Sequence, residues 1–311
     1  MRRGSDKRPQ RNASLMPMLV VIALAAIWLM VSYGTDGRSI DLNKASVSSI
    51  NQNTDQLIVH ILDVGQADSI LIQWPKDHAM LIDGGNKADG SFIVKYLEQA
   101  GVEQIDYLIA THPHEDHIGG LPYIIQKIPV RKIYMPKVTN NTKIYEDLLG
   151  AIKSKNLTIN AAKAGVILPL GEDIKAEFLA PMSGKYDDLN DYSAVLKLQY
   201  GQTKFLFMGD AGILSEKEML NSGEDLKADV IKIGHHGSSS ATSDEFLDAV
   251  QPRAAVISVG RNNDYGHPAQ STLDKLIKRN IAVFRTDEDG IVTFASDGKD
   301  IKVGTTRNSE K

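Results

Sequence analysis

The 311-residue sequence contains no cysteine, and this absence excludes several kinds of site at once. Disulfide bonds, thiolate metal ligands and cysteine nucleophiles all need a sulfur atom that the chain does not have. A transition metal can therefore be held only by histidine, aspartate or glutamate. The redox compartment stays open, because a chain without thiols functions in both reducing and oxidising surroundings.

Beyond its first 33 residues the chain also lacks an excess of positive charge. The formal net charge is −4, but residues 1–33 carry five basic side chains against one acidic side chain, a balance of +4, which leaves −8 for the rest. Proteins that coat nucleic acid by neutralising phosphates are usually basic. The charge therefore argues against tight, non-specific DNA coating, although a metal-centred site can bind a phosphodiester within an acidic protein.

Residues 15–33 are nineteen residues without a charge, and a basic segment precedes them. About 20 apolar residues span a bilayer as a helix. We therefore predict a cytoplasmic basic segment at 1–14, a single-pass transmembrane signal anchor at 15–33 and an extracellular remainder. A cleaved signal peptide, which would give a secreted protein, and a buried soluble helix are the alternatives. The polar, aperiodic residues 34–55 are expected to form a tether.

Residues 56–311 show neither an internal repeat nor a linker long enough to mark a second domain, so they are predicted to form one domain. Short β-rich runs and helical patterns follow one another, which indicates a mixed α/β fold. The strands are expected near 57–63, 69–74, 79–83, 107–110, 133–135, 176–179, 194–200, 204–208, 230–233, 254–259, 282–285 and 291–294. The helices are expected near 92–100, 144–154, 213–220, 244–250 and 271–279.

Six of the eight histidines fall in three short motifs, each at the end of an apolar strand. The first motif is the run THPHEDH at residues 111–117. Alternate residues of an extended segment point the same way, so His112 and His114 can reach one ion. Asp116 and His117 then turn towards a neighbouring position. The run therefore predicts two ligand sets, suited to two divalent metal ions about 3.5–4 Å apart.

Two later motifs are able to complete this site. Asp210 follows a buried strand and a glycine, where a carboxylate can bridge two cations or, alternatively, cap the helix expected near residue 213. The pair His235–His236 follows another strand, and adjacent side chains diverge. We favour His235 as the metal ligand and leave His236 to the ligand surroundings or the substrate. His267 is expected to contact a phosphate or donate a proton, unless it only forms a helix-entry turn.

With these residues in place, the sequence resembles the metallo-β-lactamase superfamily, and most closely the hydrolase domain of the competence DNA-uptake channel ComEC and its stand-alone relatives. Residues 63–68, DVGQAD, are similar to the DVGQGD signature of that branch, with Ala67 where glycine is usual. The segments LIDGG, HHGS and YGHP match its later motifs. The resemblance covers about residues 57–294. It implies an αββα four-layer sandwich, in which two sheets are flanked by helices and the site lies at one edge of the sheets.

The resemblance also implies how the ligands are shared. One ion would be held by His112 and His114, the other by Asp116, His117 and His235, and Asp210 would bridge them. The third first-site histidine of the superfamily is missing, and Ser193 stands in its region. An oxygen-rich first site favours Mn²⁺ over Zn²⁺, although imidazoles suit both.

The remaining candidates surround these ligands. Residues expected to act in catalysis are Asp116, His236 and His267, and residues expected to bind substrate are Ser193, His236, Ser238 and His267. Asp63 and Asp83 are expected to orient imidazoles from behind, with turn capping as the alternative. Gln66 and Asp68 are expected only to shape the rim.

The resemblance makes a metal-dependent phosphodiesterase that acts on DNA the leading hypothesis. Nineteen apolar residues cannot form a DNA-conducting pore, so the chain is expected to act outside the membrane. It would meet DNA alone or beside the DNA-uptake machinery. One alternative is a cell-surface phosphoesterase for wall or teichoic-acid phosphodiesters, and another is an inactive surface-binding module stabilised by its metals. The sequence leaves the oligomeric state open. A basic strip would favour nucleic acid, and its candidates are Lys132, Lys137, Lys143, Lys153 and Lys155.

Overall fold

The computed structural model describes residues 38–46 and 55–307. The predicted basic segment at 1–14 and the predicted anchor at 15–33 lie outside these ranges. Within them, no helix combines the length and the apolar character needed to cross a membrane.

The first sheet has nine strands in the order β1-β16-β15-β2-β3-β4-β5-β6-β7. Side chains alternate between its two faces, as the period of a strand requires. Val59 and Ile72 therefore face the second sheet, whereas Leu71 and Leu81 face helices. The strands are β1 (Ile40–Ser46), β2 (Leu57–Ile61), β3 (Ile70–Trp74), β4 (His78–Ile82), β5 (Ile105–Ile109), β6 (Val130–Met135), β7 (Ile159–Ala161), β15 (Val292–Ser296) and β16 (Ile301–Thr305).

The second sheet has seven strands in the order β14-β13-β12-β11-β10-β9-β8. Its strands β11 to β14 run parallel, so each must be joined to the next by a crossover, and a helix lies in each of the three connections. The strands are β8 (Ile167–Leu168), β9 (Ile174–Ala180), β10 (Val195–Tyr200), β11 (Thr203–Phe207), β12 (Val230–Lys232), β13 (Ala254–Ile257) and β14 (Ala282–Arg285).

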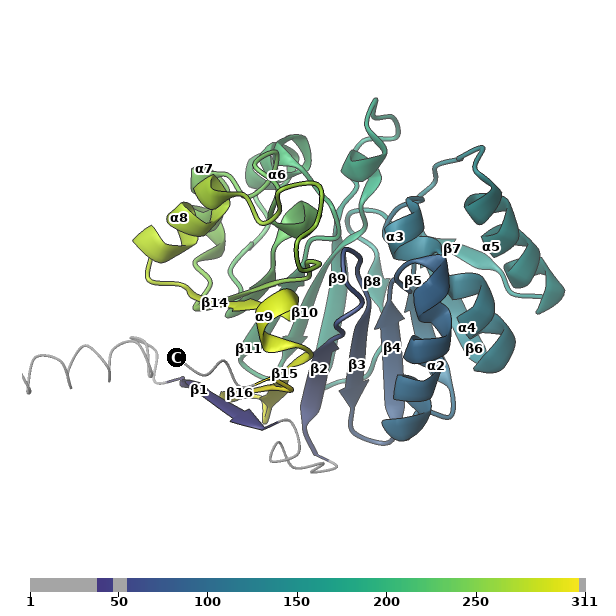
Figure 1. The fold of residues 1–311 in the computed structure, drawn as a ribbon, viewed down its shortest axis with the longest axis horizontal. Helices are drawn as coiled ribbons and strands as arrows, with labels where there is room; N and C mark the ends of the chain where they lie inside the picture. Colours follow the sequence, from purple (N-terminus) through teal and green to yellow (C-terminus); the bar gives the residue numbers. More distant parts are fainter. Residues whose placement is uncertain (1–37, 47–54, 308–311) are drawn as a thin grey trace, which may run out of the picture. The chain divides into compact units, whose positions relative to one another are not determined.

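The helices cover the outer faces of the two sheets (Figure 1). One hydrophobic cluster fills the space between the sheets, a second packs α2 (Gly90–Gln99), α4 (Leu121–Lys127) and α5 (Lys143–Ser154) on the first sheet, and a third packs α6 (Ile213–Asn221), α7 (Asp244–Val250) and α8 (Gln270–Lys278) on the second. The four layers confirm the expected αββα arrangement. Short helices are η2 (Lys87–Asp89), α3 (Glu115–Ile118), η3 (Leu189–Tyr192), η4 (Gly234–Gly237) and α9 (Thr286–Asp289).

The structure differs from the sequence prediction at the edge of the first sheet. Part of the expected tether forms β1, which runs parallel to β16 with Ile40 opposite Ile301. Neither strand is among the predicted ones. Their pairing joins segments about 260 residues apart, so no local sequence pattern predicts it. The helix α4 is also new, and Pro122 in its first turn fits a helix start.

The ends of β5, β11 and β12 bring the histidine and aspartate motifs to one edge of the two sheets. Backbone hydrogen bonds join the loops there: Ala194 N–H donates to the Thr111 carbonyl at 2.9 Å, and Asp68 N–H donates to the Asp116 carbonyl at 3.1 Å. Ligands that are far apart in the sequence are therefore fixed by the same packed edge.

Candidate metal centre

The segment between β5 and α3 presents two imidazoles to one point. His112 is buried, and its Nε2 lies 3.0 Å from Nδ1 of His114. Two nitrogens bonded to one Zn²⁺ ion at about 2.0–2.1 Å stand about 3.0–3.4 Å apart. The two side chains are therefore spaced to share an ion.

A second group contains two carboxylates and two imidazoles. One ligand atom from each of Asp116, His117, Asp210 and His236 lies within 4.8 Å of the others. His117 Nε2 is 3.6 Å from Asp116 Oδ2 and 3.3 Å from Asp210 Oδ1. His236 Nε2 is 3.2 Å from Asp116 Oδ2 and 3.6 Å from Asp210 Oδ2. Asp116 and His117 lie in the short helix α3, which follows β5. Asp210 follows β11, and His236 follows β12.

The donor atoms of this group fit a divalent cation. His117 Nε2 and Asp210 Oδ1 are buried, and neither has a hydrogen-bond partner among the described residues. A buried polar atom without a partner is costly, and a cation between a carboxylate oxygen and an imidazole nitrogen satisfies both. The site therefore has the chemistry of a metal centre built from nitrogen and oxygen ligands.

Asp210 lies between the two ligand sets. Its Oδ2 is 3.9 Å from His112 Nε2, while its Oδ1 faces His117. The preceding Gly209 has φ +52, and a Cβ there would stand 3.1 Å from the Cβ of Thr111 and 3.2 Å from that of Ser193. A larger residue before Asp210 would therefore be strained and crowded. The N-cap of α6 is Gly212, so Asp210 is free of the capping role that its sequence position also allowed.

The His235–His236 pair lies in a turn in which both residues have positive φ, +50 and +52. The turn sends the two rings in different directions. His236 is buried, and its Nδ1 lies 2.9 Å from the Ser258 carbonyl, which leaves Nε2 towards the carboxylates. The His235 side chain keeps 28% exposure, and its Nδ1 contacts Ser240. The geometry thus favours His236 as the ligand, whereas the sequence favoured His235.

The imidazoles are held from behind by Asp83, which has φ +59 and is fully buried. Thr111 donates to it through its backbone N–H at 2.8 Å and its hydroxyl at 2.7 Å. His117 Nδ1 lies 2.7 Å from the same carboxylate, and the Thr111 hydroxyl lies 3.1 Å from His112 Nδ1. Asp83 therefore orients one imidazole directly and another through a threonine.

Ser193 lies within the site as a fully buried side chain. Its hydroxyl accepts a hydrogen bond from Asp210 N–H at 3.0 Å and lies 3.4 Å from His112 Nδ1. Ser193 thus contacts the Asp210 backbone and the Nδ1 side of the His112 ring, which faces away from Nε2. These contacts differ from the substrate contact that the sequence suggested.

Two further residues also lie elsewhere than expected. The Ser238 hydroxyl contacts the Ser240 hydroxyl, which in turn contacts His235, so Ser238 acts behind that ring. The Asp63 carboxylate pairs with Arg307, and the structure records no contact between Asp63 and a histidine in the described chain. The geometry therefore supports a role behind the ligands for Asp83 but not for Asp63.

A pocket of about 340 Å³ opens over the metal-binding group. His267 lies at its rim, where its backbone N–H donates to Asn263 and its Nδ1 lies 3.4 Å from the Gln66 amide. The exposed Tyr265 ring stacks on His267, with centroids 5.7 Å apart. Most of the lining consists of residues with a role predicted from the sequence, and the additional lining residues are Glu115, Asn190 and Tyr265.

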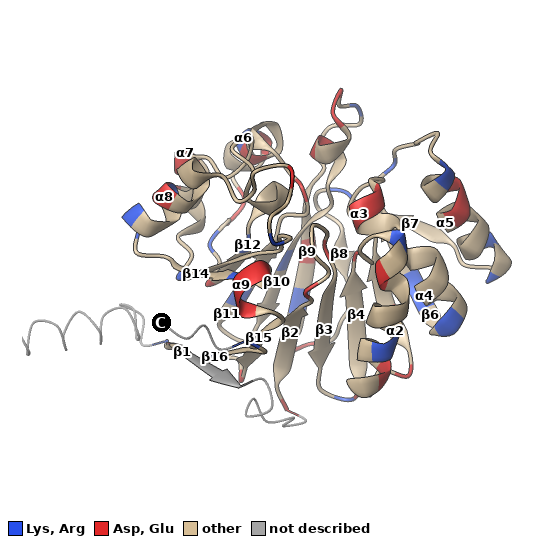
Figure 2. Ribbon diagram, viewed as in Figure 1, with Lys and Arg blue, Asp and Glu red and all other residues tan. Residues whose placement is uncertain are grey.

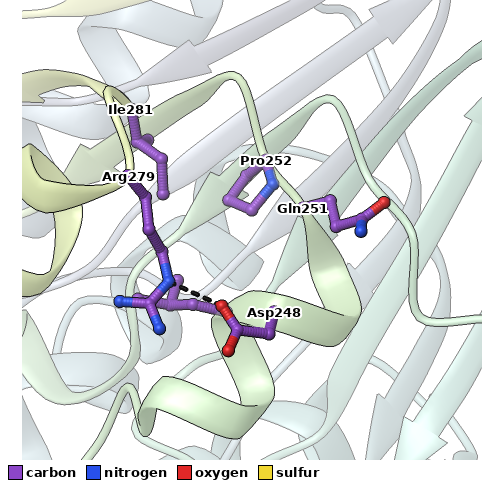
Figure 3. A pocket seen from close by; sticks show the side chains of 6 residues that line it. Asp248, Gln251, Pro252, Arg279 and Ile281 are labelled. Carbon is purple, nitrogen blue, oxygen red and sulfur yellow. Dashed lines mark hydrogen bonds and ion pairs between the residues drawn. The ribbon is translucent and has the colours of Figure 1, made fainter.

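A larger recess, about 470 Å³, lies between α7 and α8 (Figure 3). The Arg279 guanidinium in it is bonded by Asp248 at 2.8 Å and by Asp244 at 2.7 Å. Its lining contains no histidine, and its cation is neutralised by two carboxylates. The smaller histidine-lined pocket is therefore the functional site.

The lysines proposed as a basic strip lie on β6, on the loop after it and on α5, where acidic side chains accompany them (Figure 2). Lys143 pairs with Asp147 at 2.8 Å, and Lys155 donates to a backbone carbonyl at 3.1 Å. Lys132 lies over the Tyr107 ring, 5.7 Å from its centroid. This region is therefore one of mixed charge.

Burial and the neighbouring carboxylates shift the protonation of the site in opposite directions. Burial lowers the pKa of His112 well below its usual value. Burial opposes protonation of His117 as well, but Asp210, Asp116 and Asp83 outweigh it and raise the pKa of that imidazole well above the usual value. The carboxylates around His117 therefore favour a positive charge at this point, as the ligands of a metal cation also do.

Comparisons with known proteins identify relatives of the chain. The chain is 32% identical over 253 residues to ComE operon protein 3 of Bacillus subtilis, covering 76% of this chain and 32% of the relative. It is 29% identical over 289 residues to competence protein ComA of Neisseria gonorrhoeae, covering 91% and 39%. The chain thus spans about a third of the length of these curated relatives.

A solved structure shares the fold. Igni18, a metallo hydrolase from Ignicoccus hospitalis, superimposes with a TM-score of 0.51 at 17% identity, covering 76% of this chain and 98% of that one. The family model of the metallo-beta-lactamase superfamily matches residues 62–261, which include the histidine run, Asp210 and His236. The chain therefore belongs to the metallo-beta-lactamase superfamily.

Proposed function

We propose that the chain is a metal-dependent phosphodiesterase that acts on DNA and uses two divalent ions, Mn²⁺ or Zn²⁺. The observation that carries the proposal is the position of Asp210 between two ligand sets, with His112 on one side and His117 on the other. Two cations held by these residues would activate a water molecule and neutralise charge on a phosphoryl group.

We propose a role for each side chain around the two ions. We assign the first ion to His112 and His114, the second to Asp116, His117 and His236, and the bridge to Asp210. His235 and His267 face the pocket, and their rings lie 5.6 Å apart. Either ring can hold a non-bridging phosphate oxygen or protonate the leaving oxygen as the ester bond breaks.

DNA is proposed as the substrate because the sequence resembles the hydrolase domain of a DNA-uptake channel and because one relative, ComA of Neisseria gonorrhoeae, is named a competence protein. The first site offers two imidazoles and the carboxylate oxygens of Asp210 without a third imidazole, a donor set that either Mn²⁺ or Zn²⁺ can use. The acidic net charge beyond residue 33 and the ion pair of Lys143 with Asp147 on α5 limit long-range attraction of a polyanion. Binding would therefore depend on the metal centre more than on the surrounding surface.

The test uses the purified full-length chain with Mn²⁺ or Zn²⁺ and three substrates: linear DNA, circular DNA and bis-p-nitrophenyl phosphate. We expect hydrolysis of all three, and loss of at least a hundredfold in His114→Ala and Asp210→Ala. Cleavage of the small diester without DNA would instead favour a cell-surface phosphoesterase for wall or teichoic-acid diesters. Metal binding without any hydrolysis would favour an inactive surface-binding module.

The location is part of the same proposal. A transmembrane anchor at 15–33 would place the catalytic domain outside the cell membrane, where it would meet incoming DNA alone or beside DNA-uptake machinery. Protease treatment of intact cells provides the check, because only an exposed domain is degraded before lysis.

A further inference from the structure

A fully buried ion pair lies beneath the metal-binding group. Lys232, the last residue of β12, has a completely buried side chain, and its ammonium group bonds the carboxylate of Asp68, which is 2% exposed. A lysine is almost never fully buried unless it is paired, because desolvating its charge is costly. The burial of Lys232 therefore indicates a specific structural or functional role for this ion pair.

The pair connects the two halves of the molecule. Lys232 belongs to the second sheet, whereas Asp68 lies in the loop between β2 and β3 of the first sheet. Asp68 also accepts a backbone hydrogen bond from Gly85 at 2.8 Å and donates one to Asp116 at 3.1 Å. The metal-binding group is divided in the same way, since Asp116 and His117 follow the first sheet and Asp210 and His236 follow the second. The ion pair thus spans the same gap that the metal must span.

Each partner also reaches a ligand. The Lys232 ammonium donates to the Gly209 carbonyl at 3.1 Å, which fixes the backbone directly before Asp210. The Asp68 carboxylate lies 3.6 Å from His236 Nδ1 and 3.9 Å from His117 Nδ1, on the side of both rings away from their Nε2 atoms. Its Oδ1 is buried and has no hydrogen-bond partner within the described ranges.

We propose that Lys232 and Asp68 are a positioning pair that holds the two halves of the ligand set at the separation a shared metal needs. Lys232 fixes the Asp210 backbone, and Asp68 places negative charge behind the imidazoles of His117 and His236. The residues that line the pocket include no lysine or arginine, so Lys232 also brings a positive charge beneath a site rich in carboxylates. The inference rests on the proposed metal centre.

The test compares metal affinity with fold stability in the full-length chain. Replacing a buried ion pair by neutral groups of similar volume often leaves stability unchanged, so the double variant Asp68→Asn/Lys232→Met keeps the fold. We expect the melting temperature of its metal-free form to stay within a few degrees of the wild type. We expect its Mn²⁺ and Zn²⁺ dissociation constants, measured by titration calorimetry, to rise about 10–100-fold, as when supporting groups behind ligands are removed.

Asp106→Asn is the matched control. Asp106 is another buried carboxylate of the first sheet, and it accepts hydrogen bonds from Ala79 N–H and Gln104 rather than contacting a site residue. This variant should lower the melting temperature without changing the metal dissociation constant. If this double variant does not fold, Asp68→Leu/Lys232→Met, which replaces the pair by two apolar side chains of similar volume, provides the same comparison.

Unchanged metal affinity and stoichiometry in the folded variant would overturn the inference and leave the proposed function standing. If the wild-type protein itself bound no divalent metal, the proposed function would fail first, and the positioning role would fail with it.

Discussion

His117 Nδ1 lies 2.7 Å from Oδ2 of Asp83, and both side chains are fully buried. A bond at Nδ1 fixes which nitrogen carries the proton and leaves Nε2 for the metal. The same carboxylate receives the Thr111 hydroxyl, which contacts His112. One aspartate therefore supports imidazoles from both ligand sets, so its removal should disturb both.

Replacing Asp83 by asparagine should weaken metal binding and kcat/KM about 10–100-fold, because Asn keeps the shape but not the charge that orients His117. Asp63→Asn is the comparison, since the sequence assigned both aspartates the same role and the structure pairs Asp63 with Arg307. Metal titration and diester hydrolysis measure both effects. Equal losses in the two variants would show that the sequence assignment was right for Asp63.

The adjacent histidines should separate into two kinds of loss. His236→Ala removes a buried nitrogen from the metal-binding group, so about one ion per chain should be lost after dialysis. His235→Ala should keep both ions and lower kcat, because this half-exposed ring faces the pocket. Metal content by mass spectrometry and steady-state kinetics distinguish the two. The reverse pattern would restore His235 as the ligand.

Local signals in the sequence predicted most strands and the histidine run, whereas the four layers were implied by the family resemblance. Alternating apolar residues indicate strands, and closely spaced histidines after a strand indicate a metal site. The strand β1 escaped prediction because its partner β16 lies far away in the chain and its own polar composition suggests a tether.

The choice between His235 and His236 needed the backbone. Sequence shows that adjacent side chains diverge, but only the folded turn shows that the His236 ring is buried while the His235 ring stays partly exposed. Lys232 carried a usable signal, since it is a lysine within the otherwise apolar strand-end sequence of residues 230–233. Its partner Asp68 did not, because an aspartate in a turn is ordinary until the second sheet closes over it.

Ser193→Ala tests the position where the third histidine is missing. The change leaves Asp210 N–H without its buried acceptor, which should cost about 1–3 kcal/mol of stability and weaken the first metal site. Ser258→Ala is the matched control, because the buried Ser258 hydroxyl has no hydrogen-bond partner in the part of the chain that the structure describes. Urea unfolding of the metal-free proteins should show a loss only for Ser193→Ala. A loss of equal size in both variants would mean that burial of any hydroxyl here matters.

Stability should also depend on pH through His60, a buried histidine away from the metal-binding group. Its Nε2 lies 3.2 Å from Oε1 of the Gln73 side-chain amide, and its Nδ1 lies 3.0 Å from the Tyr96 hydroxyl. Burial lowers the pKa of His60 to about 4. Since the pKa in the unfolded chain is about 6.5, unfolding takes up a proton between these values.

The folded state is therefore fully favoured by this group above pH 6.5 and loses stability as the pH falls from there towards 4. The loss should be about 2 kcal/mol by pH 5 and about 3 kcal/mol below pH 4. His60→Gln removes the titrating group while keeping a polar side chain, so its unfolding free energy should change less between pH 7 and pH 5 than that of the wild type. Urea unfolding with a chelator at both pH values measures the difference without interference from metal loss. Parallel pH dependences in the two proteins would show that His60 is not the group responsible.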